Sequence, residues 1–159
     1  MQSFDVLFLC ETNAAVSLMA EALVNHRADP RIRAFSAGRN PAPRMLEEAR
    51  AALAAAAVPA DGLEPKAWTI FSLPGARRPD VVVDLATVTW TGPGVSAFPD
   101  VPVLRWPLRD PALATDRRER RGLAEVVRDA LSGRIADELA ARLLAPARPS
   151  RTPGFAAAV

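Results

Sequence analysis

Short apolar runs alternate along the chain with stretches in which apolar residues recur at helical spacing. The runs predict four strands, over residues 4–9, 32–36, 81–85 and 103–106. The helical spacing predicts helices over residues 17–27, 45–57 and about 116–144. Strands that alternate with helices favour an α/β fold, in which a four-stranded, mainly parallel sheet forms the middle of a three-layer sandwich.

The last predicted helix carries signals at its start and near its end. Asp116 can cap the first turn, with Glu119 three residues later as in a capping box. Gly133 is a candidate interruption of the same helix. The last fifteen residues hold three prolines and little that could pack. We therefore predict one domain over residues 1–145 and a loose tail over residues 146–159.

The composition excludes several classes of protein. The 159 residues include one cysteine, Cys10, and one histidine, His26, so neither an intrachain disulfide nor a zinc cluster is expected. The net charge of +2 is small and the charges are mixed, which gives no reason to expect a nucleic acid partner. No apolar run reaches the length of a membrane span, and the first residues do not read as a secretory signal. We expect a cytoplasmic protein that binds no membrane and needs no cofactor.

Cys10 stands where the first predicted strand ends and shortly before the first predicted helix begins. A helix N-terminus presents unpaired N–H groups that can hold an oxyanion, and its field lowers the pKa of a nearby thiol. Ser17 could donate a hydrogen bond to the thiolate or cap the helix, and Asn13 could take a left-handed conformation in the loop. From this local pattern alone, Cys10 is either a nucleophile or a small buried residue at a strand end.

Residues 10–23 read CETNAAVSLMAEAL. This segment resembles the phosphate-binding loop and first helix of the low-molecular-weight protein tyrosine phosphatases and of the related thioredoxin-coupled arsenate reductases. Further segments follow in the family's order, namely FSAG at 35–38, GL-x-x-K-x-W at 62–68, the strand at 80–85 and the Asp-Pro pair at 110–111. The resemblance covers roughly residues 4–144 and implies a fold like that of phosphotyrosine phosphatase I.

The resemblance also implies roles for the matching residues. Cys10 would attack phosphorus or arsenic, and Asp110 would protonate the leaving oxygen. The loop would hold phosphate, sulfate or a similar oxyanion, and a phosphoprotein is one candidate partner. The loop residues implied in this binding are Thr12, Asn13, Ala14, Ala15, Val16 and Ser17.

The largest departure from the family is Val16, which occupies the position of the loop arginine. That arginine grips two equatorial oxygens of the anion, and a charged arginine in phosphoryl transfer is worth about 10³ to 10⁵ in rate. Glu11 adds a negative charge beside the loop, which opposes both a thiolate and a phosphate unless its side chain points outward. Ala86 and Thr87 stand where related arsenate reductases carry a second cysteine, so a thiol relay would need an external thiol.

Three loop arginines, Arg39, Arg44 and Arg109, are candidates to replace the missing guanidinium. Arg109 is the best candidate because it adjoins Asp110; the alternative is that all three are surface cations. Asp110 could equally be a turn residue before a proline. The arginines at 117, 118, 120 and 121 are expected on the solvent face of the last helix. We expect a structural or solvated role for His26, and core or partly buried packing for Trp68, Trp90 and Trp106.

Three functions remain open at this point. The first is a phosphatase or arsenate reductase relative with a degenerate loop and weak or altered cysteine-dependent activity. The second is a non-catalytic descendant that binds an oxyanion or a protein. The third is a redox sensor in which Cys10 alone forms a mixed disulfide.

Overall fold

The computed structural model describes residues 3–27, 29–88 and 98–144. Its sheet contains the strands β1 (Phe4–Cys10), β2 (Ile32–Gly38), β3 (Val81–Asp84) and β4 (Val103–Arg105). They lie in the order β2-β1-β3-β4, and every neighbouring pair is parallel. The predicted α/β class and the four predicted strands are therefore confirmed, with β2 two residues longer than expected.

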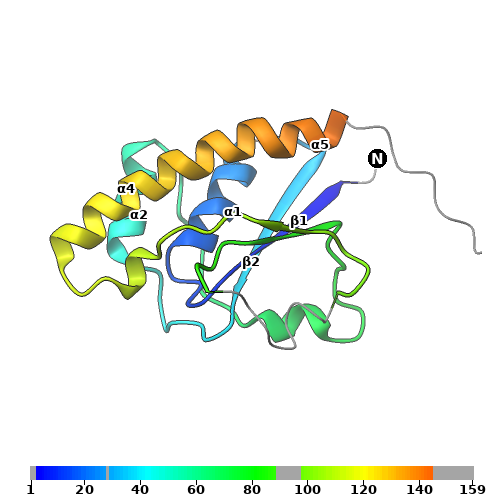
Figure 1. Cartoon of the computed structure of the whole chain (residues 1–159), viewed down its shortest axis with the longest axis horizontal. Coiled ribbons are helices and arrows are strands. Elements are labelled where there is room, and N and C mark those ends of the chain that lie inside the picture. Colours follow the sequence, from blue (N-terminus) through cyan, green and yellow to red (C-terminus); the bar gives the residue numbers. More distant parts are fainter. Residues whose placement is uncertain (1–2, 28, 89–97, 145–159) are drawn as a thin grey trace, which may run out of the picture.

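The sheet carries a packed layer on each face because side chains alternate along a strand. On one face, Val6, Phe8 and Cys10 of β1 join the core formed by the helices. On the other face, Leu7 and Leu9 belong to a smaller cluster. That cluster also contains Phe98 and Val101 and packs against the 3₁₀ helix η1 (Trp68–Ser72). Figure 1 shows the long last helix above the sheet and η1, in green, below it.

The helices of the first face are α1 (Val16–His26), α2 (Glu47–Ala55) and α4 (Arg117–Arg134). The predicted helices over 17–27 and 45–57 are confirmed, although α2 is shorter at both ends. A short 3₁₀ helix, η2 (Pro111–Leu113), precedes α4. These helices form the main core with the inner face of the sheet, so the strand that ends in Cys10 is buried at the centre of the domain.

The predicted long helix is present, but its irregular part is not at Gly133. That glycine lies inside α4, which continues through a π-helical turn (Ile135–Leu139) into α5 (Ala140–Leu144). Within the turn, the carboxylate of Glu138 accepts a 2.7 Å hydrogen bond from Nε1 of Trp106. Trp106 is therefore a packed core residue whose one polar atom has a partner, as expected.

Within the described residues, no helix combines the length and apolar character needed to cross a membrane. The predicted tail over 146–159 lies outside the described residues.

Asp116 caps α4 as predicted, since its carboxylate accepts a hydrogen bond from the N–H of Arg118. We expect Asp116→Ala to lower the free energy of unfolding by about 0.5–2 kcal/mol, because one helix-end donor loses its acceptor. Urea unfolding of both proteins measures this difference. An unchanged midpoint and slope would contradict the assignment of Asp116 as the cap.

Candidate active site

The candidate site lies at the carboxyl edge of the sheet, where β1 ends in Cys10. Residues 11–15 form a loop that leads directly into α1. In parallel α/β sheets this edge is where ligands bind, because loops from neighbouring strands meet there. The loop from β2 lies against it through three hydrogen bonds, from the N–H groups of Arg39, Asn40 and Ala42 to the carbonyls of residues 10, 11 and 12.

Asn13 gives the loop its shape. Its φ of 47° is left-handed, a conformation that asparagine adopts more readily than most residues, as predicted. Gly38 at the end of β2 leaves room for it. A Cβ added to Gly38 would lie 2.9 Å from both the backbone nitrogen and the Cβ of Asn13. The glycine of the FSAG segment is thus required by the close approach of this loop.

The side chain of Asn13 orients Ser17 toward the cysteine. Its Oδ1 accepts a 2.8 Å hydrogen bond from the backbone N–H of Lys66, so its amide nitrogen points the other way. That nitrogen donates to Oγ of Ser17 at 2.7 Å. Ser17 Oγ lies 2.9 Å from Sγ of Cys10, which leaves the serine proton free to be donated to the sulfur. Ser17 therefore acts on the thiol, and it makes no side-chain cap for α1.

A polar cluster of Ser36, Glu21 and Lys66 supports Asn13 from beneath. Ser36 Oγ accepts from the Asn13 amide at 3.0 Å and donates to the Glu21 carboxylate. Nζ of Lys66, the chain's single lysine, lies 3.3 Å from Glu21 Oε2 and 3.4 Å from Ser36 Oγ. The lysine balances a partly buried carboxylate and closes the network. Ser36 and Lys66 belong to the two segments that resemble the family, but the sequence did not indicate their connection through Glu21.

The Cys10 thiol is buried, with 2% of the residue exposed. Burial raises the pKa of this thiol, and the nearby Asp110 carboxylate raises it further. Hydrogen bonds from Ser17 and from the N–H of Asn13 act in the opposite direction without overcoming burial. The expectation of a lowered pKa was therefore wrong, because the hydrogen bonds to the thiol do not offset its loss of solvent.

Asp110 makes the turn contact that the sequence left open, and it also contacts the Cys10 loop. Its Oδ1 accepts a hydrogen bond from the N–H of Ala112 at 2.9 Å, which is the turn role. Its Oδ2 accepts from Thr12 Oγ1 at 3.1 Å, which attaches it to the Cys10 loop. Burial, followed by the charge of Glu11, raises the pKa of this carboxyl, whereas the two hydrogen bonds lower it. A carboxyl that holds its proton more firmly suits a general acid.

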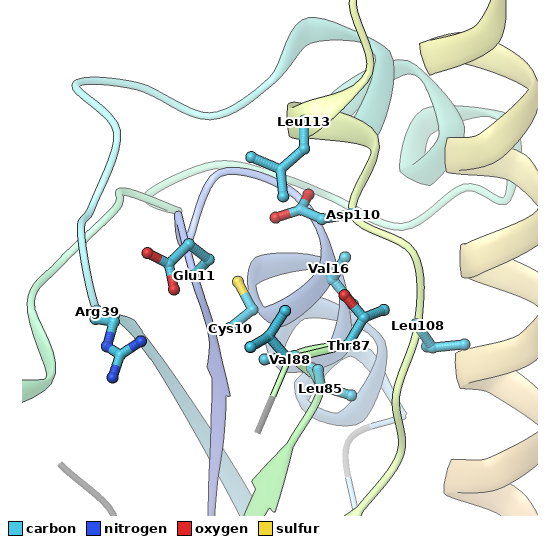
Figure 2. Close-up of a pocket in the computed structure, with 11 residues that line it drawn as sticks. Cys10, Glu11, Val16, Arg39, Leu85, Thr87, Val88, Leu108, Asp110 and Leu113 are labelled. Atoms are coloured by element: carbon cyan, nitrogen blue, oxygen red, sulfur yellow. The ribbon is translucent and has the colours of Figure 1, made fainter. Parts of the chain in front are cut away.

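A cavity of about 270 Å³ lies between these groups. Cys10, Val16 and Asp110 line it, and Figure 2 shows the Cys10 sulfur below the Asp110 carboxyl. Its walls are mainly apolar, with Leu85, Thr87, Val88, Leu108 and Leu113 among them. Sequence reasoning did not identify the four apolar members of this wall, because they come from separate segments that only the fold brings together.

The other predicted loop residues follow Cys10 in the loop and at the start of α1. Ala14 and Ala15 are buried beneath the loop surface, and Thr12 Oγ1 also accepts a 3.3 Å hydrogen bond from the N–H of Ala14. Val16 is fully buried and faces the cavity with a side chain that donates nothing. Glu11 lines the rim, where its carboxylate accepts a 2.7 Å hydrogen bond from Nδ2 of Asn40.

Arg109 does not reach the loop, contrary to its ranking as the best substitute for the missing arginine. Its guanidinium donates to Glu119, and 67% of its side chain is exposed. Glu119, the partner in this ion pair, is the residue that we expected to complete a capping box with Asp116. Arg44 is exposed on a different groove, whereas Arg39 lines the cavity.

The remaining candidates stay outside the site. His26 is exposed at the end of α1, and Trp68 packs against the smaller core cluster. Trp90 lies outside the described residues. No group of three or more histidine, cysteine, aspartate or glutamate side chains in the described part of the chain is arranged to hold a metal ion.

The sequence matches the model of the low-molecular-weight phosphotyrosine protein phosphatase family over residues 5–89, more than half of the chain. The chain belongs to this family, and the resemblance seen in the sequence is confirmed. The matched region contains Cys10, its loop and the FSAG segment, and it ends before Asp110. No curated protein matches the chain in sequence.

Solved structures share the fold along most of their length. An arsenate reductase in the phosphate-binding state is 21% identical, with a TM-score of 0.68 over 86% of this chain and 97% of that one. An arsenate reductase from Archaeoglobus fulgidus is 30% identical, with a TM-score of 0.57 over 83% and 99%. A tyrosine phosphatase from Erwinia amylovora is 17% identical, with a TM-score of 0.68 over 88% and 93%.

Gly38→Ala tests the close approach between β2 and the Cys10 loop. We expect a loss of about 1–3 kcal/mol in the free energy of unfolding, because the added methyl group meets backbone atoms of the loop. Gly133→Ala is the matched control, since nothing lies within 4 Å of a Cβ there and alanine favours a helix. Equal effects of the two substitutions in urea unfolding would contradict this account.

Asp110→Asn tests the raised pKa of the Asp110 carboxyl. Protonation of this group contributes stability that is complete below the pKa of the unfolded chain, about 4, and is lost as pH rises through the folded-state pKa. The wild type should therefore gain stability relative to the variant as pH falls from about 8 to about 4. Urea unfolding at both pH values measures the difference. A constant difference, or one that changes in the opposite direction, would exclude a raised pKa.

Proposed function

We propose that this protein is a weak, cysteine-dependent phosphatase that binds a tetrahedral oxyanion in the Cys10 loop. The observation that carries this proposal is the placement of the Cys10 thiol and the Asp110 carboxyl on one cavity, over a loop shaped by Asn13. The substrate class is a phosphate monoester, and a phosphoprotein is a candidate partner.

The proposed reaction has two steps. The Cys10 thiolate attacks phosphorus, an S–P bond forms and the P–O bond to the leaving group breaks, while Asp110 gives its proton to the leaving oxygen. Water then attacks the phosphorylated cysteine, Asp110 takes a proton from that water, and the S–P bond breaks to release phosphate. Ser17 supports the thiolate in both steps through its 2.9 Å contact with the sulfur.

Two features of the same site make the proposed activity weak. Val16 provides no guanidinium to neutralise the charge of the transition state. Burial raises the pKa of Cys10, so only a small fraction of the thiol is ionised at neutral pH. The proposal includes a cytoplasmic location, where a free thiol stays reduced.

The same two features favour a second candidate, a non-catalytic oxyanion-binding protein of the family. In that case, the loop backbone binds an anion and Cys10 is a remnant. The redox sensor is disfavoured, because a sensor needs an accessible thiol of low pKa. Cys10 is buried, and its pKa is raised.

Turnover of an aryl phosphate by the wild type, Cys10→Ser and Val16→Arg separates the two candidates. We expect slow turnover by the wild type, none by Cys10→Ser, and a rise of about 10² to 10³ with Val16→Arg, since one preorganised donor is restored. Val16→Ala is the matched control at the same buried position, and unfolding curves show whether each variant folds.

Cysteine-independent turnover would contradict the proposed mechanism. Phosphate binding by folded wild type and folded Val16→Arg, without turnover by either, would favour the non-catalytic candidate. If neither the wild type nor Val16→Arg binds phosphate or turns over the substrate, both candidate functions are excluded.

A further inference from the structure

Among the described residues that line the cavity with Cys10, Arg39 is the only one with a positive charge. We propose that Arg39 supplies the cation for the bound oxyanion, from the end of β2 rather than from the Cys10 loop. This inference rests on the proposed oxyanion site. It names the residue of that site that provides the positive charge, which Val16 does not.

The backbone holds Arg39 close to the nucleophile. Cys10 and Gly38 are paired in register at the ends of β1 and β2, and Arg39 is the next residue. Its N–H donates to the carbonyl of Cys10 at 3.2 Å, and the N–H of Asn40 donates to the carbonyl of Glu11 at 2.8 Å. The Cα of Arg39 is therefore anchored beside Cys10 by a segment that cannot move without breaking these bonds.

The side chain of Arg39 must rotate to complete the site. Figure 2 shows it on the Glu11 side of the cavity, with its guanidinium turned away from the sulfur. Glu11 lines the same cavity, and Asn40 holds its carboxylate at the rim. A bound dianion provides a stronger attraction than one carboxylate at the rim, and it selects the inward rotamer.

Three other cations near this edge of the sheet do not line the cavity. Arg109 pairs with Glu119, and Lys66 lies under the loop with Glu21. Arg105, at the end of β4, pairs with Asp84. Each has a carboxylate partner on a different element, and none of the three lines the cavity.

Binding of inorganic phosphate, measured by titration calorimetry, tests this assignment without depending on turnover. The variants are Arg39→Ala, Arg39→Lys and the control Arg44→Ala, which removes the same charge from an exposed arginine on the same segment. We expect Arg39→Ala to bind phosphate about tenfold more weakly, the effect of losing one hydrogen bond to a charged group. Arg39→Lys should retain part of the affinity, and Arg44→Ala should bind like the wild type.

Two results would overturn the inference in distinguishable ways. A wild type that binds no phosphate would remove the oxyanion site itself, and the proposed function with it. If the wild type binds phosphate and Arg39→Ala binds it as tightly as the wild type or Arg44→Ala does, Arg39 is not the cation. The proposed oxyanion site then still stands. Unfolding curves of the variants check that each is folded under the conditions in which its phosphate binding is measured.

Discussion

Asn13 connects the strand, the helix and the loop that together form the candidate site. Its left-handed backbone turns the chain, and its side chain receives a hydrogen bond from Lys66 and donates to Ser17 and Ser36. Because each of these bonds uses a different atom or proton of the amide, the orientation of Asn13 determines that of Ser17. The position of the serine beside Cys10 follows from that orientation.

The electrostatics of the site depend on the burial of its two titratable groups. Val16 adds apolar surface to a buried position, and no guanidinium there balances the thiolate or the anion. Burial therefore raises the pKa of both Cys10 and Asp110, and the negative charge of Glu11 adds to the effect on Asp110. The site therefore favours neutral groups, which fits the weak catalysis and the role of Arg39 that we propose.

Local pattern was sufficient for much of the fold and for part of the site. The buried strand before Cys10, the helix after it and the cap at Asp116 all depend on short-range spacing, and the structure contains each of them. The place of Arg109 could not be found in this way. Its position beside Asp110 suggested that its side chain reaches the Cys10 loop. Instead, the first turn of α4 brings Glu119 within reach of its guanidinium.

The sequence by itself determined the α/β architecture, the lone cysteine at a strand end and the absence of an intrachain relay, because these depend on residue order and composition. Tertiary structure decided which charges meet. It joined Lys66 to Glu21 across 45 residues, gave the cavity its apolar wall and placed Arg39 on the cavity that Cys10 lines. The physical reason is that electrostatic contacts and burial depend on distances between segments, which periodicity along one segment does not contain.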